Sequence, residues 1–198
     1  MSLARTLARR AAMQALYQWQ LARGSLADLE TQFVEELRLT KSLYQRYRAG
    51  VELSAAEREL LGELLEKYGR TRETEAEVTS EQETLERRAE RCQVPEVQVS
   101  YFKSLLYGVV DNLGAIDEVL KPFLDRSIED VDPVERAILR IACYELLYCP
   151  DVPCRVVLNE AINLAKEFGA SQSYRYVNGV LDRVTRVHRA AELTSGRR

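Results

Sequence analysis

Residues 132–150 read DPVERAILRIACYELLYCP, and this segment carries both ends of one predicted helix. Asp132 has the type of side chain that caps a helix N-terminus, and Pro133 suits the first helical position, where no backbone N–H is needed. Apolar residues then recur at steps of three and four as far as Leu146. Pro150 ends the pattern, because proline is not tolerated in a helix interior. The segment therefore predicts a helix with an apolar face buried in a core.

The same helical spacing extends outward from this segment in both directions. Apolar residues follow it in the ranges 3–21, 26–37, 55–68, 101–116, 156–168 and 177–184. Short connections that contain Gly24, Pro122, Pro153 or Gly169 separate several of these ranges. Gly24 is predicted to end the first helix, and Ser25 is predicted to cap the start of the second. No range alternates apolar and polar residues for long enough to predict a sheet. The sequence therefore predicts an all-α protein, a compact bundle of about seven helices.

Length and composition exclude several classes of protein. The chain has 198 residues, a net charge of −3 and one histidine, His188. A single histidine and four cysteines without C-x-x-C spacing argue against a metal site, so we expect free thiols and no cofactor. No apolar run reaches the ~18 residues of a membrane span, and no apolar signal-peptide region follows the N-terminus. We expect a cytoplasmic protein with no membrane segment, on which any nucleic-acid surface is local.

Residues 39–94 differ in composition from the rest of the chain. Ser54 and Glu57 have capping-box spacing and begin a predicted helix that Gly69 ends. Residues 70–91 then contain seven glutamates but only two large apolar residues, Val78 and Leu85. So polar a segment cannot bury enough surface to offset its ordering entropy. We interpret 39–94 as a charged, partly helical insertion that protrudes from, or lies loosely on, a domain formed by 1–38 and 95–190, with 191–198 as a flexible tail.

Positive charge is concentrated toward the two ends of the chain. No acidic residue precedes Asp28, and the first predicted helix carries cationic, amide and aromatic side chains at three- and four-residue steps: Arg5, Arg9, Arg10, Gln14 and Tyr17. Arg175 and Tyr176 belong to a second basic element near the C-terminus. Guanidinium groups neutralise phosphates and rings stack on bases, so both elements are candidates for binding single-stranded RNA. Spacing alone favours the plainer interpretation of solvated helix faces.

An acidic turn lies between the two basic elements and comprises Asp125, Glu129, Asp130, Asp132 and Glu135. Part of this charge serves helix N-termini, where anions are stabilising. The remainder would repel phosphate and would suit a basic protein partner. Paired carboxylates can also act as acid and base, but no nucleophile, metal cluster or phosphate-binding loop accompanies them. The sequence therefore predicts binding and no catalysis, with Asp130, Asp132 and Glu135 as partner-binding candidates.

An ordered set of short motifs runs through both halves of the chain. Near the N-terminus the motif is RRAAMQALYQW at 9–19, and YF lies at 101–102 with GV at 108–109. The C-terminal half adds VERAILRIA at 134–142, YEL at 144–146, DVP at 151–153, NEA at 159–161, LAK at 164–166, FG at 168–169 and VNGVLD at 177–182. Each motif is weak alone, whereas the ordered set is specific, and it resembles the NusB family of bacterial transcription antitermination factors, with 101–109 similar to the family's central helix. The resemblance covers about residues 3–38 and 97–188.

The resemblance implies two small helical subdomains without catalytic activity. Proteins of this family bind the boxA element of ribosomal-RNA leader transcripts together with NusE, a small-subunit ribosomal protein, in an antitermination complex on RNA polymerase. By position, the residues that face RNA would be Arg9, Tyr17, Phe123, Glu129 and Tyr176, with Glu135 near the surface that faces NusE. The resemblance also favours RNA binding by Arg5, Arg10, Gln14 and Arg175, and it leaves open a homodimer formed through the same surface.

Several features depart from the family pattern or need a structural reason. Phe123 lies where the family often has tyrosine, and so lacks a hydroxyl group; Gln172 occupies a position that is often acidic. The insertion 39–94 has no counterpart in that pattern. Gly179 lies inside a helical range, where glycine costs ~1 kcal/mol relative to alanine, so we expect close helix packing around it.

Two alternative functions stay open on the sequence. The chain could be a protein–protein adaptor whose acidic turn and insertion bind a partner, with negligible affinity for RNA. It could also be the NusB-like part of a ribosomal-RNA methyltransferase, although the residues up to Arg198 leave no room for a cofactor-binding sheet.

Overall fold

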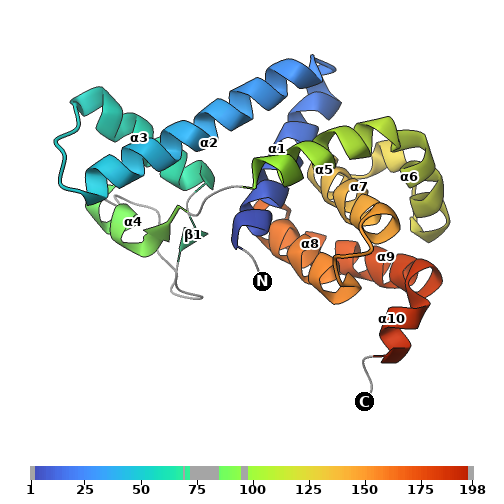
Figure 1. Cartoon of the computed structure of the whole chain (residues 1–198). Helices are drawn as coiled ribbons and strands as arrows, with labels where there is room; N and C mark the ends of the chain where they lie inside the picture. The colour runs from blue at the N-terminus through green and yellow to red at the C-terminus, as the bar shows by residue number, and fades with distance from the viewer. Residues whose placement is uncertain (1–2, 69, 72–84, 95–97, 196–198) are drawn as a thin grey trace.

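The fold is a helical assembly in which one lobe contains α2, α3 and α4 and the other contains α5 to α10, with α1 between them (Figure 1). The computed structural model describes residues 3–68, 70–71, 85–94 and 98–195. Within these residues the elements are α1 (Leu3–Ala22), α2 (Leu26–Arg48), α3 (Ala55–Tyr68), β1 (Arg70–Thr71), α4 (Leu85–Arg91), β2 (Cys92–Gln93), α5 (Val99–Asp111), α6 (Leu113–Leu120), η1 (Lys121–Phe123), η2 (Ile128–Asp130), α7 (Pro133–Tyr148), α8 (Cys154–Phe168), α9 (Ser173–His188) and α10 (Ala190–Ser195). The all-α prediction is confirmed.

α1 is the central helix, and α5 and α7 pack along it. Its fully buried alanines Ala8, Ala11, Ala12 and Ala15 let neighbouring backbones approach closely, while Leu7 and Leu16 fill the spaces beside them. Burial of this kind on several sides differs from the one-sided burial of a surface helix. α1, which the sequence indicates as a basic helix, is therefore mainly part of the hydrophobic core.

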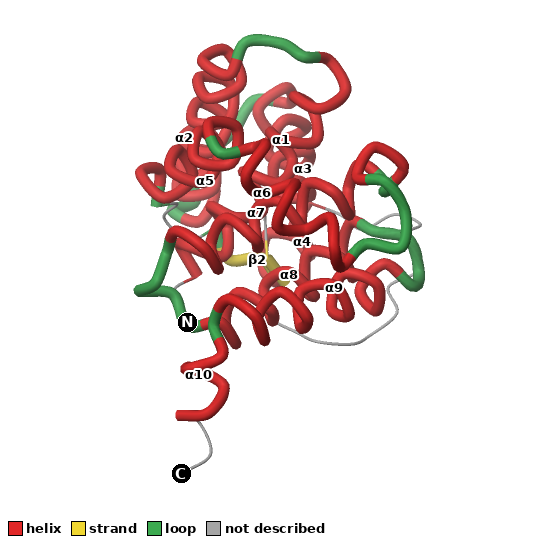
Figure 2. The backbone as a smooth tube through the Cα atoms, turned by 90° about the vertical axis from the view of Figure 1, so that its right-hand side faces the viewer, coloured by secondary structure: helices red, strands yellow, loops and turns green. Residues whose placement is uncertain are grey.

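α7 contains the segment that opens the sequence argument, and its predicted ends are confirmed. The Asp132 carboxylate accepts hydrogen bonds from the backbone N–H groups of Val134 and Glu135, and Pro133 is the first helical residue. Buried Ala137, Ile138, Ile141 and Leu146 face the neighbouring helices. α8 and α9 complete the core beside α7 and lie next to each other (Figure 2).

The polar side of α7 is anchored to two other helices. The Arg140 guanidinium pairs with the Asp117 carboxylate of α6 at 2.7 Å and donates to the Gln20 side chain of α1 at 2.5 Å. A charged group that is removed from water needs such partners. The two contacts fix α1, α6 and α7 relative to one another.

More helices are present than the seven expected, for local reasons. The range 101–116 was expected to form one helix, but it divides into α5 and α6 at Asn112, whose side-chain amide donates to the carbonyl of Gly108 at 2.8 Å. A side chain that bonds to the preceding turn competes with the continuing helix. Residues 191–195, expected in a flexible tail, lie in α10, where the Glu192 carboxylate accepts from the backbone N–H of Cys154 at 2.9 Å. Residues 196–198 lie outside the described part.

Other predicted helix ends are confirmed in part. Ser25 caps α2, and Ser54 and Glu57 form the reciprocal hydrogen bonds of a capping box at the start of α3. Gly24 is predicted to end α1. The chain instead turns at Arg23, which adopts the left-handed conformation, with φ of 52°.

The segment 39–94 begins inside a continuous helix, since α2 runs through residue 39 as far as Arg48. α3 shares the hydrophobic core, to which it contributes Leu61, Leu65 and Tyr68, and the ring of Tyr68 meets Phe33 edge-on at 6.5 Å. β1 and β2 pair antiparallel beside α4. The glutamates expected in a protruding arm fall mostly at 72–84, outside the described residues.

Glycine at 108 and glycine at 179 have opposite surroundings. A Cβ atom at Gly108 would lie 2.2 Å from the ring of Tyr144, whereas one at Gly179 meets nothing within 4 Å. The expected close packing around Gly179 is therefore wrong, and the close helix approach occurs at Gly108.

We predict that Gly179→Ala raises the free energy of unfolding by up to ~1 kcal/mol, because alanine is the better helix former. Gly108→Ala forces the Tyr144 ring to move and should lower it by about 1 kcal/mol or more despite the same gain in propensity. Urea unfolding followed by circular dichroism measures both. An equal gain for the two variants would contradict the packing described at Gly108.

Candidate nucleic-acid interface

Arg9 is buried, which corrects its assignment as a residue that faces RNA. Its side chain is 3% exposed, and its guanidinium contacts the Glu145 carboxylate at 2.6 Å and donates to the Tyr101 hydroxyl at 3.1 Å. The Tyr101 hydroxyl donates in turn to Glu145. Burial opposes the charge on Arg9, but the hydrogen bonds and charge of Glu145 outweigh it, so the pKa of Arg9 is raised. The guanidinium is committed to the core.

Arg5 and Arg10 lie nearer the surface but are engaged with other side chains. Arg5 is 35% exposed, pairs with Asp151 at 3.4 Å and lies over the ring of Tyr101. Arg10 is only 12% exposed, pairs with Glu167 of α8 at 2.8 Å and donates to the carbonyl of Glu66 in α3 at 3.2 Å. Arg5 and Arg9 thus both contact Tyr101, whereas Arg10 contacts α3 and α8, and the three arginines do not form one phosphate-binding face.

Gln14 and Tyr17 are half-buried on the same helix. The side-chain oxygen of Gln14 is inaccessible to solvent and accepts no hydrogen bond from the described residues. α1 therefore offers at most the edges of Arg5, Arg10 and Tyr17 to a ligand.

The first turn of α9 carries a more accessible combination of cations and rings. Arg175 is exposed, and its guanidinium lies 5.7 Å from the centroid of the Tyr174 ring. The ammonium group of Lys166, from the last turn of α8, lies 5.6 Å from the same ring. Tyr174 is thus contacted by a cation from each of two helices, an arrangement stabilised by cation–π attraction.

Tyr176 lies on another side of the first turn of α9, facing the loop before η2. The Arg126 guanidinium lies 5.6 Å from the Tyr176 ring and is held by a two-fold contact with its neighbour Asp125 at 2.9 and 3.0 Å. Burial and the charge of Asp125 raise the pKa of Tyr176 to about 12. Arg126 holds the pKa of Asp125 below its usual range, so the pair stays charged at neutral pH.

Phe123 lies two residues before Asp125 in the chain. It is half-buried in η1, and its carbonyl accepts a hydrogen bond from Arg183 of α9 at 2.6 Å. We call Lys166, Tyr174, Arg175, Tyr176 and Arg126 the α9 surface.

The acidic candidates divide between structural and exposed roles. Asp132 caps α7, and Asp130 accepts from the Ser127 hydroxyl at 2.8 Å. Glu129 is exposed, and Glu135 is half-buried close enough to Arg126 and Tyr176 to influence their pKa values. Of the four, Glu135 thus borders the α9 surface.

Sequence reasoning missed Arg126 and Lys166. Arg126 belongs to the acidic turn. The net negative charge of that turn conceals a cation that contacts the ring of Tyr176, a predicted site residue. Lys166 lies eight residues before Tyr174, beyond the reach of a single-helix pattern. The helix hairpin formed by α8 and α9 is the signal that could have found Lys166, whereas Arg126 lies in the loop before η2, 50 positions from Tyr176.

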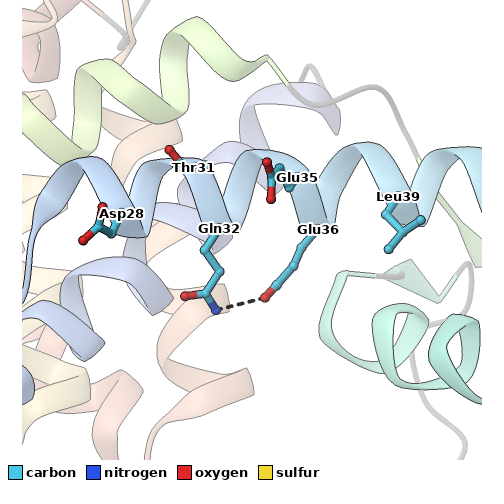
Figure 3. A pocket seen from close by; sticks show the side chains of 6 residues that line it. All are labelled: Asp28, Thr31, Gln32, Glu35, Glu36 and Leu39. Atoms are coloured by element: carbon cyan, nitrogen blue, oxygen red, sulfur yellow. Dashed lines mark hydrogen bonds between the residues drawn. The ribbon is translucent and has the colours of Figure 1, made fainter.

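Other kinds of site receive no support from the described residues. Within them, no group of three or more histidine, cysteine or carboxylate side chains is placed to hold a metal ion, and no helix has the length and apolar character to cross a membrane. Cys143, Cys149 and Cys154 are free thiols. A hollow of about 470 Å³ lies along α2, lined by Asp28, Thr31, Gln32, Glu35, Glu36 and Leu39, apart from every predicted site residue (Figure 3).

We predict that Arg9→Met lowers the free energy of unfolding by about 3–5 kcal/mol, because it leaves the Glu145 carboxylate buried without its cation. The double variant Arg9→Met/Glu145→Leu should recover most of that loss, since an apolar pair can replace a buried ion pair. The matched control Arg186→Met removes an exposed arginine paired with Asp182 and should cost less than ~1 kcal/mol. Urea unfolding that gives equal losses for Arg9→Met and Arg186→Met would contradict the burial of Arg9.

Comparisons with known proteins identify relatives along the whole chain. A protein of Methylococcus capsulatus named transcription antitermination protein NusB is 66% identical over 198 residues, all of both chains. A protein of the same name from Tolumonas auensis is 36% identical over 182 residues, 92% of each chain. The full-length match to the M. capsulatus protein gives the segment 39–94 a counterpart there, which corrects the expectation that it has none.

Solved structures share the fold at lower identity. T. maritima NusB superimposes with a TM-score of 0.58 at 24% identity, over 98% of this chain and 99% of that one. A complex of the antitermination factors NusB and NusE with dsRNA gives 0.55 at 20% identity, over 94% of this chain and 99% of that one. A model of the NusB family matches residues 55–186 and so includes α3. The chain belongs to the NusB family.

Proposed function

We propose that this chain is a transcription antitermination factor that binds boxA-type single-stranded RNA of ribosomal-RNA transcripts together with the ribosomal protein NusE. It acts in the cytoplasm, as part of the antitermination complex on RNA polymerase, without catalysis and without a cofactor. The observation that carries the proposal is the α9 surface, where Tyr174 and Tyr176 each lie beside a cation. Family membership supplies the class of ligand.

The chemistry of the α9 surface suits an unpaired RNA strand. Exposed guanidinium and ammonium groups attract phosphates, and tyrosine rings provide faces on which unstacked bases pack. Tyr176 also has a buried hydroxyl, which lies beside the Asp125 carboxylate. Its ring edge is therefore the part of Tyr176 available to RNA, with Arg126 beside it.

The surface is held in place by the core before any ligand arrives. Below it, Val177, Val180, Leu181 and Val184 of α9 are fully buried against the neighbouring helices. A preformed site loses little conformational entropy on binding. The bidentate Asp125 contact similarly fixes the Arg126 guanidinium in advance, which supports recognition without folding.

The carboxylates beside the α9 surface suit the partner protein. Glu135 borders Arg126 and Tyr176, and Glu129 and Asp130 are exposed on the preceding 3₁₀ helix. They would repel RNA phosphates and attract a basic protein surface. We assign NusE to this side, adjacent to the RNA, while Arg5, Arg10 and Tyr17 of α1 contribute at its edge.

We predict that Tyr176→Ala weakens binding of a boxA-containing RNA, measured with NusE present, by about 1–3 kcal/mol, the usual worth of one stacked base. Tyr176→Phe is the matched control: it keeps the ring, removes only the buried hydroxyl and should bind as the wild type does. Fluorescence anisotropy against single-stranded, double-stranded and scrambled RNA gives the affinities.

A second variant tests the electrostatic part separately. Arg175→Gln should reduce the slope of log affinity against log salt by about 0.7 in magnitude, the value for one phosphate contact on a single strand. Equal affinity for boxA and scrambled RNA, with and without NusE, would support the protein–protein adaptor and overturn the proposal. Preference for the duplex would overturn the single-strand assignment.

A further inference from the structure

α2 carries its charges in two separate halves. Residues 26–37 contain Asp28, Glu30, Glu35 and Glu36 and no basic residue, whereas residues 38–48 contain Arg38, Lys41, Arg46 and Arg48 and no acidic one. The helix extends away from α1 toward the end of the molecule where α3 begins (Figure 1). The two halves of the helix therefore carry electrostatic potentials of opposite sign.

The acidic half is largely satisfied within the protein. Glu30 pairs with Lys103 at 2.5 Å and accepts from Tyr107, and Glu36 accepts from Lys67 at 2.5 Å and from Tyr68 at 2.6 Å. Gln32 also donates to Glu36 along α2, where both side chains line the hollow (Figure 3). These carboxylates tie α2 to α3 and α5, which explains their presence structurally.

The basic half is satisfied only in part. Arg46 pairs with Glu57 of α3 at 2.6 Å, and this contact helps to hold the pKa of Glu57 at about 2. Arg38 and Arg48 are exposed, and no residue of the described chain forms a hydrogen bond or ion pair with either guanidinium. Two arginines thus remain without an internal role.

These two arginines share a helix face with Lys41 and Gln45. Steps of three, four and three residues place the four side chains on one stripe. Thr40 and Leu43, which are buried toward α3, lie on the opposite side. Ten residues at 1.5 Å each give the stripe a length of about 15 Å, enough for more than one phosphate of a strand. We call Arg38, Lys41, Gln45 and Arg48 the α2 stripe.

The helix macrodipole does not explain the α2 stripe. Cations stabilise a helix within its last turn, which accounts for Arg46 and Arg48. Arg38 and Lys41 lie two or more turns before the end, where that effect has faded. Arg38 is exposed on the same face as Arg48, with Lys41 half-buried between them, and two exposed guanidinium groups on one face indicate a ligand outside the chain.

We propose that the α2 stripe is a second RNA-binding surface, which holds the phosphate backbone of single-stranded RNA flanking the recognised element without reading its sequence. Arginine and lysine pair with phosphates and glutamine donates to them, contacts that position a strand but carry no sequence information. The surface contains no exposed ring, so it differs from the α9 surface, which can stack bases. The inference goes beyond the proposed function, because it concerns a separate surface and non-specific contacts.

RNA fits the α2 stripe better than an acidic protein does. A protein surface that binds stably needs an apolar centre from which water is excluded. The stripe holds only charged and amide side chains, of which Arg38, Gln45 and Arg48 are exposed and Lys41 is half-buried. Strong dependence on salt and tolerance of any sequence are the properties expected of such a surface.

The test compares two RNAs and three forms of the full chain, with NusE present. One RNA contains the boxA element alone, and the other adds a flank of about 20 uridines, longer than a typical single-strand binding module covers. The α2 variant is Arg38→Gln/Arg48→Gln. The matched control Arg155→Gln/Arg186→Gln also removes two exposed arginines, from α8 and α9. Oligouridine alone is titrated as a third ligand, so that the stripe is tested even if boxA binding fails.

The wild type and the control should bind the flanked RNA more tightly than boxA alone, and the α2 variant should lose that gain while its boxA affinity stays unchanged. Two phosphate contacts contribute about 1.4 to the salt slope, so the gain from the flank should shrink roughly 7-fold between about 50 and 200 mM salt. No gain in the wild type, a gain that survives in the α2 variant, or an equal loss in the control overturns the inference. Absence of boxA binding in every form would instead overturn the proposed function.

Discussion

Arg9 of α1 places a guanidinium at the junction of α1, α5 and α7, where water cannot reach it, and Glu145 and Tyr101 supply its partners. Glu160 of α8 lies 4.0 Å from the same guanidinium and accepts from Thr6, which brings a fourth helix into the cluster. A buried ion pair adds little net stability compared with an apolar pair, but an arrangement that separates its partners is strongly disfavoured. The cluster therefore selects one packing of the helices, and the orientation of α9, which packs against α7 and α8, depends on it.

This constraint divides the charges of the molecule into two groups. Arginines inside the bundle, such as Arg9 and Arg140, bind carboxylates and fix helices, whereas Arg126, Arg175, Arg38 and Arg48 face solvent. The net charge of −3 averages over both groups and does not describe either. Recognition of an anionic polymer depends on the second group, whose positions are set by the first.

Helix positions and caps were predictable because they depend on local rules. Asp132, Ser25 and Ser54 each bond to backbone within a few residues, so the pattern contains all the information needed. The role of Arg9 was not predictable, because its partner Glu145 is 136 positions away and a one-helix projection cannot show that both sides of α1 are covered. Gly108 and Gly179 give the same lesson: both lie in helices, and only the approach of Tyr144 distinguishes them. Arg126 escaped notice because its immediate neighbours are acidic.

The long separation between α1 and its main partners also governs the order in which the protein can assemble. The α2–α3 pair is local in the chain and can form as soon as it leaves the ribosome, since domains tend to fold from the N-terminus during synthesis. α1 must wait for α5 and α7, and contacts between such distant residues slow folding. The apolar face of α1 is thus synthesised first but is buried only after α5 and α7 have been synthesised. A nascent chain paused before α7 would expose this alanine-rich face, which makes it a natural target for chaperones that act during translation.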